Sequence, residues 1–215
     1  AELSLLPVFC RKWPSVYAAV EDGGQDWEWL ESYCMQQLPP SGPVLFSLDG
    51  TAWPHPAARA LADLQYVFSP TPAVDGGSIV VGHPYSVLAW IPECGRSWAG
   101  PVSIRRVPST QSDVEMGIEQ VKRLCRQRQT EMLEDLHLVV ADAKYGNHHF
   151  LGPLKDEPCG ALVRMRRDRV LYGVPPVYRG RGRPRVHGER FAFKEPESWQ
   201  EPDAIVELED ERWGK

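Results

Sequence analysis

Paired cysteines and long hydrophobic runs are both missing from this sequence of 215 residues. The five cysteines are scattered and odd in number, without a Cys-x-x-Cys pair, which argues against a disulfide scaffold or a zinc ribbon. No run approaches the roughly 18 apolar residues of a membrane helix, and the first residues show no basic-then-apolar signal pattern. With 42% hydrophobic and 25% charged residues, the composition is that of a globular domain in a reducing cytoplasm.

Net positive charge is concentrated in one segment. Residues 164–190 carry nine arginines against Asp168 and Glu189, within a chain whose net charge is −5. Residues 195–215 are acidic, with eight acids against two bases. Because a planar guanidinium binds phosphate oxygens in pairs, the arginine block indicates a local phosphate-binding or nucleic-acid-binding surface. A solvated basic loop that pairs with the acidic tail is the alternative, and charge alone does not separate the two.

The first half of the chain changes from a helical to a strand pattern. Residues 1–42 are expected to form helical segments that end at a Pro-Pro pair. Beyond them, three apolar runs separated by Gly and Pro predict an antiparallel meander, with the first strand ended by a turn at Asp49-Gly50-Thr51. The three runs are residues 44–48, 78–91 and 102–107.

Helices and strands then alternate. A capping box at residues 112–115 predicts the start of a helix that extends to about residue 135. Its apolar stripe follows at helical spacing: Val114, Ile118, Val121 and Cys125. The apolar run 137–141 predicts a central strand, followed by a short helix at 148–155 and a strand at 161–165. The whole order predicts an α/β fold with a mixed sheet, in which three antiparallel strands precede helix–strand units.

The composition shifts again near residue 172. Residues 173–188 are rich in Gly, Pro and Arg and cannot bury a core, so they predict a loop or an extended arm. Short strands at 191–193 and 204–208 are expected to begin a β-rich insertion. The sequence thus predicts three parts: a helical segment (1–42), a core (43–172), and a basic arm with a partial, truncated insertion (173–215).

Two aspartates follow apolar strands. Asp49 comes directly after residues 44–48, and Asp142 directly after residues 137–141. If the two strands are neighbours, both carboxylates lie at one edge of the sheet and need a cation such as Mg²⁺ between them. A metal pair held in this way can activate a nucleophile and stabilise the leaving oxygen of a phosphodiester. The ordinary alternatives are an Asp-Gly turn for Asp49 and a helix N-cap for Asp142. Trp53 is the tryptophan expected near a substrate.

Five segments, in order and spacing, resemble the DDE transposases of bacterial insertion sequences, in particular the actinobacterial branch with an insertion domain. They are residues 46–55, 82–87, 139–146, 162–169 and 180–188. The resemblance implies a ribonuclease-H-like fold in which three carboxylates hold two Mg²⁺ ions, or Mn²⁺, for DNA strand cleavage and transfer. Asp49 and Asp142 would be the first two carboxylates. Double-stranded DNA as partner, a dimer in the active complex and a nucleoid-associated location in the cytoplasm are also expected.

The basic residues would then bind transposon-end DNA. Lys144 stands where relatives commonly have a small residue, and it either reaches a phosphate or perturbs the site. The expected DNA-binding residues are Arg164, Arg166, Arg167, Arg179, Arg181, Arg183, Arg185 and Lys144.

The third carboxylate is missing from the pattern. In the family it is a glutamate in a Tyr-x-x-Arg-x-x-x-Glu-like motif on a later helix, and this sequence contains no such motif. Glu207, Glu209 and Glu211 lie in a predicted strand and tail and are not assigned. The expectation is a catalytic piece, truncated before the third carboxylate, that does not transpose alone. The alternatives are a non-catalytic DNA-binding remnant and a metal-dependent phosphohydrolase, and nine arginines argue against a small substrate.

Overall fold

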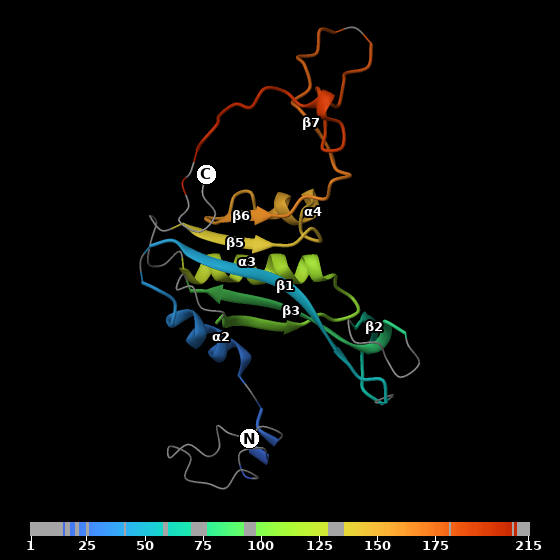
Figure 1. Ribbon diagram of the computed structural model, residues 1–215. Coiled ribbons are helices and arrows are strands. Elements are labelled where there is room, and N and C mark those ends of the chain that lie inside the picture. The colour runs from blue at the N-terminus through green and yellow to red at the C-terminus, as the bar shows by residue number, and fades with distance from the viewer. Residues whose placement is uncertain are drawn as a thin grey trace. The chain divides into compact units, whose positions relative to one another are not determined.

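The computed structural model of the protein describes residues 15, 18–19, 22–24, 26–40, 42–57, 60–69, 77–92, 98–128, 136–180, 182–207 and 209 (Figure 1). The chain divides into two compact units, residues 1–163 and residues 164–215, and each is described by itself. The three-part division drawn from composition stays a prediction.

A mixed six-stranded sheet forms the centre of the first unit (Figure 1). Its strand order is β2-β3-β1-β5-β6, and β4 also pairs with β3. β1, β3 and β4 are antiparallel, whereas β1, β5 and β6 run parallel. This arrangement confirms the predicted α/β fold and is compatible with a ribonuclease-H-like fold. The strands are β1 Val44–Pro54, β2 Gln65–Phe68, β3 Ile79–Ile91, β4 Gly100–Arg106, β5 His137–Ala141 and β6 Gly160–Val163.

β1 is longer than predicted, and Asp49 lies inside it. The strand pairs with β3 from Leu45 to Pro54, but with β5 only from Val44 to Leu48. The predicted turn at Asp49-Gly50-Thr51 is therefore wrong, because hydrogen bonding to β3 continues the ladder through these residues. Beyond the end of β5, β1 and β3 extend together and are joined by β2, which the sequence analysis did not predict.

The helix that follows β4 begins where its cap predicted. The Ser112 backbone N–H donates to Glu115 Oε2 at 2.7 Å, and the Glu115 N–H donates to Ser112 Oγ at 3.2 Å, so the capping box is confirmed. This helix is described to Arg128, and residues 129–135 of the prediction lie outside the described residues. The helical elements of the unit are α2 Trp27–Gln36, α3 Asp113–Arg128, α4 His148–Leu151 and the 3₁₀ helix η2 Gly152–Leu154.

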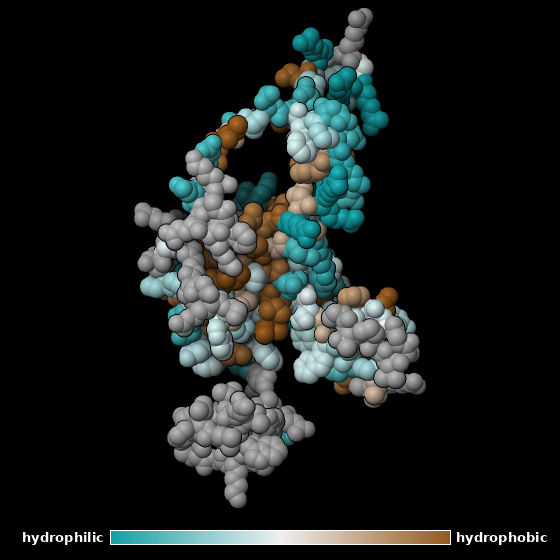
Figure 2. All heavy atoms as spheres, in the orientation of Figure 1, coloured by the Kyte–Doolittle hydropathy of each residue, from teal (hydrophilic) through white to brown (hydrophobic). Residues whose placement is uncertain are grey.

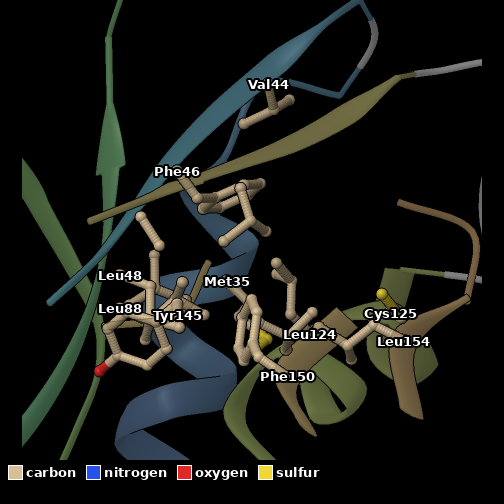
Figure 3. Close-up of a cluster of buried hydrophobic side chains, with 14 of the residues drawn as sticks. Met35, Val44, Phe46, Leu48, Leu88, Leu124, Cys125, Tyr145, Phe150 and Leu154 are labelled. Carbon is tan, nitrogen blue, oxygen red and sulfur yellow. The ribbon is translucent and has the colours of Figure 1, made fainter. Parts of the chain in front are cut away.

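One hydrophobic core joins these helices to a single face of the sheet (Figure 3). Leu48 of β1, Met35 of α2, Leu124 of α3 and Phe150 of α4 all contribute to it. The predicted stripe of α3 is only partly right. Val121 and Cys125 are buried, but Val114 and Ile118 are half-buried at the margin, and the buried face instead includes Met116, Gly117, Gln120 and Leu124.

Polar contacts hold α2 and α3 on the same face. Glu31 of α2 accepts a hydrogen bond from Ser103 Oγ of β4 at 2.6 Å and two from the Arg105 guanidinium at 2.7 and 2.6 Å. Gln120 of α3 donates to the same Ser103 hydroxyl at 2.9 Å and accepts from Ser86 Oγ of β3 at 2.6 Å. These buried polar side chains satisfy one another, which fixes the two helices against the strands.

The second unit is small and largely polar on its surface (Figure 2). It contains the antiparallel pair β7 Val170–Tyr172 and β8 Arg190–Ala192, followed by the 3₁₀ helix η3 Pro196–Ser198. The strand predicted at 191–193 is thus present one residue earlier. The strand predicted at 204–208 is wrong for residues 204–207, which are exposed and unassigned to any strand.

Across the described ranges, no helix is both long and apolar enough to cross a membrane.

Candidate functional site

Asp49 and Asp142 occupy equivalent positions on neighbouring parallel strands. The last paired residues of β1 and β5 are Leu48 and Ala141, and each aspartate is the next residue along its chain. Because parallel strands lie about 4.8 Å apart and point the same way, the two aspartates stand next to each other at one end of the sheet. Both are exposed.

Local hydrogen bonds orient both carboxylates. Asp49 Oδ1 accepts from the Gly50 backbone N–H at 2.7 Å, and Asp142 Oδ1 accepts from the Lys144 backbone N–H at 2.9 Å. The alternative of a helix N-cap is wrong for Asp142, because the N-cap of α4 is Asn147, which accepts from the Phe150 N–H. Asp142 instead holds the turn that follows β5.

A third aspartate, which the sequence analysis missed, stands close by. Asp113 is the first residue of α3, and its Oδ2 forms an ion pair with Lys144 Nζ. A Cβ added at Gly50 would lie 3.4 Å from Lys144 Nζ and 3.9 Å from Asp113 Oδ2. The ion pair therefore lies beside the backbone of β1, one residue beyond Asp49. An acidic first turn is common in helices, so only the tertiary structure singles out Asp113.

All three carboxylates affect the pKa of the Tyr145 phenol. Its side chain is fully buried, and within the described part of the chain its hydroxyl has no hydrogen-bond partner; Figure 3 shows this oxygen at the edge of the core cluster. Burial, together with the negative charges of Asp113, Asp49 and Asp142, raises the pKa of Tyr145 to about 12. The Ser86 hydroxyl opposes that rise in pKa, and it donates its own hydrogen bond to Gln120. This end of the sheet thus carries concentrated negative potential, which attracts cations.

The acidic residues have the chemistry that a divalent cation needs. Carboxylate oxygens are the ligands that Mg²⁺ prefers, and Asp49 with Asp142 supplies two carboxylates on adjacent strands. Among the residues that the structure describes, however, no group of three or more His, Cys, Asp or Glu side chains is arranged to hold a metal ion. Glu207 and Glu209 are exposed in the second unit, and Glu211 lies outside the described residues.

The predicted DNA-binding arginines all fall in the second unit. The predicted DNA-binding lysine, Lys144, lies in the first unit. Three of the arginines, Arg164, Arg166 and Arg167, follow β6, and Arg179, Arg183 and Arg185 lie in the loop between β7 and β8. Arg181 lies outside the described residues; the remaining arginines of the set are exposed.

The arginine loop takes its shape from glycines and one tyrosine. Gly180 and Gly182 both have a φ of +78°, a left-handed conformation that other residues rarely adopt. The Tyr178 hydroxyl donates to the Gly182 carbonyl at 2.8 Å and closes this turn. Arg185 lines a hollow of about 570 Å³ at the base of the loop. The described arginines of this loop, Arg179, Arg183 and Arg185, are exposed around the turn.

Two arginines of the second unit form ion pairs with acidic residues near them in the chain. Among the described residues, the ion pairs of the second unit join Arg166 to Asp168 at 3.0 Å and Arg190 to Glu195. The contact with Glu195 raises the pKa of Arg190, and the same contact lowers the pKa of Glu195. Neither ion pair involves the arginines at 179, 183 and 185.

The family model of the DDE superfamily endonucleases matches residues 17–215, which is most of the chain. The chain belongs to this family. Comparison with curated proteins and with solved structures gave no significant match.

A DDE superfamily endonuclease is a nuclease of the transposase type that acts on DNA and uses divalent metal ions. A phosphohydrolase of small substrates, the third alternative from the sequence, does not belong to this family.

Proposed function

We propose that this chain is the catalytic region of a DDE transposase of the insertion-sequence type, which cleaves and transfers DNA strands at transposon ends. The observation that carries the proposal is the position of Asp49 and Asp142, each one residue beyond the paired residues Leu48 and Ala141. The actinobacterial branch with an insertion domain, which the sequence resembles, remains part of this proposal.

Asp49 and Asp142 are proposed to hold Mg²⁺, with Mn²⁺ as a substitute. Two such ions, when bound, would activate the attacking oxygen and stabilise the leaving oxygen of the phosphodiester. The carboxylates orient the metal, while the Gly50 and Lys144 backbone N–H groups hold the carboxylates. A third carboxylate completes such a site in the family, and we expect the two aspartates alone to bind metal too weakly for strand cleavage.

The arginines are proposed to bind the phosphates of double-stranded transposon-end and target DNA. Arg164, Arg166 and Arg167 would contact DNA from the segment after β6, and the loop arginines at 179, 181, 183 and 185 from the tight turn. Lys144 is proposed to contact a phosphate at the cleavage site. A dimer in the active complex and action at the nucleoid, in the cytoplasm, complete the proposal.

Metal binding tests the acidic site directly. Titration of the whole chain with Mn²⁺, followed by electron paramagnetic resonance, should show a site that Asp49→Asn and Asp142→Asn each weaken by at least tenfold. Asp156→Asn is the matched control, because the Asp156 side chain is 87% exposed and pairs only loosely with Lys155 at 3.9 Å. Unchanged Mn²⁺ affinity in both site variants would falsify the metal site.

A DNA-binding remnant without chemistry is the second candidate. It is favoured because, in the described ranges, no three acidic side chains are arranged to hold a metal ion, although Asp113 lies nearby. Both candidates predict that affinity for duplex DNA falls steeply with salt, because phosphate contacts release counterions. Changing Arg179, Arg181, Arg183 and Arg185 to Gln should reduce the log–log salt slope by about 0.9 per lost contact. If the chain binds duplex DNA but has no Mn²⁺ site, the non-catalytic remnant is the better description. If the variant with all four arginines changed binds duplex DNA as well as wild type does, the loop has no role in DNA binding in either candidate function.

A further inference from the structure

A cavity of about 820 Å³ lies in the first unit, and its lining includes neither Asp113 nor Lys144. Its walls come from β1, β3, β4 and the first residue of α2. The side chains used in the argument are Trp27, Thr51, Trp53, Tyr85, Val87 and Arg106. Its volume is within the range of pockets that hold small organic groups, and its lining is mainly aromatic and apolar with a few polar groups.

The cavity continues directly from Asp49. In the sheet register, Asp49 is opposite Val87, and Val87 is opposite Ile104. Residues that are directly opposite each other in an antiparallel sheet share one face. Asp49, Val87 and Ile104 therefore form one row across three neighbouring strands, and Val87 and Ile104 of this row line the cavity.

A second row, parallel to the first, also lines the cavity. Thr51 is opposite Tyr85, and Tyr85 is opposite Arg106. Thr51 is two residues from Asp49, which is about 7 Å along a strand. The cavity therefore begins within about one nucleotide length of the carboxylate that is proposed to hold the metal.

Three of the residues that line the cavity are aromatic: Trp27, Trp53 and Tyr85. The side chains of Trp53 and Trp27 are 62% and 51% exposed, which is a large apolar area for two tryptophans beside a polar site. Trp53 is held in place by ring contacts with His55, at 5.5 Å between centroids, and with Tyr85, at 6.4 Å. These rings are thus positioned before any ligand binds, which lowers the entropic cost of binding.

Positive charge stands at the same cavity. The Arg106 side chain is 43% exposed, and its Nη2 pairs with Asp63 Oδ2 at 3.3 Å. A guanidinium beside aromatic faces is the combination that proteins use for single-stranded nucleic acid, because bases stack on the rings while cations neutralise the phosphates. A base inside an intact duplex offers no free ring face for such stacking, so the ligand has to be unpaired.

We propose that this cavity binds an unpaired base of the DNA strand whose neighbouring phosphate lies at Asp49. The inference rests on the proposed function for its substrate, DNA, and adds the recognition of an unpaired nucleotide beside the cleavage site. Trp53 and Tyr85 supply the stacking surface, and Arg106 supplies the charge for the adjoining backbone.

The test uses the whole chain in EDTA, so that its result does not depend on metal. The probe is a short single-stranded oligonucleotide with one 2-aminopurine, whose fluorescence falls when the base stacks on an aromatic ring. We expect quenching on binding, a preference for the single strand over the blunt duplex, and an affinity for the single strand that Trp53→Ala lowers about fivefold to a hundredfold. Trp53→Phe should restore most of the affinity.

Trp29→Ala is the matched control, because Trp29 is 63% exposed on α2, stacks on Tyr33 and does not line the cavity. Replacing the 2-aminopurine-bearing nucleotide of an otherwise identical oligonucleotide by an abasic one tests the same contact without altering the protein. We expect the abasic oligonucleotide to lose the same affinity on the wild-type chain, and to be insensitive to Trp53→Ala.

Equal binding of the abasic and complete oligonucleotides, or no quenching of 2-aminopurine, would overturn the inference that the cavity binds a base. The outcome is separable from that of the proposed function. If Asp49→Asn abolishes the Mn²⁺ site while Trp53→Ala changes nothing, only the base-binding inference fails. If Trp53→Ala weakens single-strand binding while Mn²⁺ affinity is unchanged in Asp49→Asn, only the metal site fails.

Discussion

Lys144 and Asp113 form an ion pair that joins the turn after β5 to the first turn of α3. The ammonium group lies beside Gly50, the residue that follows Asp49 in β1. The sequence analysis left open whether Lys144 contacts a phosphate or perturbs the site. The ion pair shows that, in the absence of ligand, Lys144 neutralises an acidic neighbour.

Removing this ammonium group should strengthen metal binding. Lys144→Ala leaves Asp49, Asp113 and Asp142 without their nearby cation, so the site becomes more negative. We expect Mn²⁺ affinity to rise about twofold to fivefold, which is the effect of a partly exposed charge. Calorimetric titration at low salt measures the change, and the gain should shrink at 0.5 M salt because ions screen exposed charges. A lower affinity in Lys144→Ala would show that the lysine instead helps to hold the metal ligands.

The buried carboxylate of Glu31 should matter for stability. Its side chain is only 5% exposed and pairs with both Arg105 and Arg123, so Glu31→Ala removes the carboxylate that pairs with Arg105 and leaves Arg123 only the exposed Glu28. We expect a loss of about 2–4 kcal/mol in the free energy of unfolding. Glu28→Ala is the control, since Glu28 is 78% exposed and meets Arg123 at 3.5 Å, and it should cost less than about 0.5 kcal/mol. Urea unfolding of both variants decides between a structural and a peripheral role.

Gly117 of α3 should resist replacement by alanine. A Cβ at this position would lie 2.9 Å from Leu48 Cδ2 and 3.1 Å from Tyr145 Cε1, and both side chains are buried. Alanine gains about 1 kcal/mol of helix propensity over glycine, but overpacking costs about 1–3 kcal/mol, so Gly117→Ala should lower the stability by about 1 kcal/mol.

The shift of Leu48 and Tyr145 in this variant should also weaken Mn²⁺ binding at the adjoining aspartates. Gly24→Ala serves as the control, because an added Cβ there meets nothing within 4 Å. Thermal unfolding and the Mn²⁺ titration report the two effects separately. A stabilised Gly117→Ala protein with unaltered metal binding would contradict the close packing of α3 on β1.

The capping box at the start of α3 predicts a pH dependence. Hydrogen bonds from the Ser112 backbone and hydroxyl lower the pKa of Glu115, so the folded chain releases this proton more readily than the unfolded chain does. The resulting stabilisation is present above the ordinary pKa of 4.5 and disappears as the pH falls through the lowered value. Glu115→Gln should therefore be less stable than wild type at pH 7, and the two proteins should converge near pH 3.

Urea midpoints of both proteins across this range provide the measurement. Ser112→Ala, which removes the hydroxyl of the cap, should cost about 1 kcal/mol at pH 7. A difference between wild type and Glu115→Gln that is the same at both pH values would argue against the lowered pKa.

Much of the fold was predictable because local patterns agree with it. The apolar run 137–141 became a central strand, and the capping box at 112–115 opened α3. Predictions failed where pairing partners decided the outcome. Asp49-Gly50-Thr51 has the composition of a turn, yet the ladder with β3 keeps it extended, and Gln120 is polar but buried because Ser86 and Ser103 satisfy it.

Residue types and their order along the chain determined the two candidate aspartates, the exposed arginine segment and the succession of strands and helices. Only the tertiary structure decided which side chains surround them. Asp113 is 29 residues from Asp142 in sequence, and the Trp53 cavity combines residues of four separate elements. Such neighbours depend on strand register and helix packing, which are set by long-range burial and hydrogen bonding that no local pattern encodes.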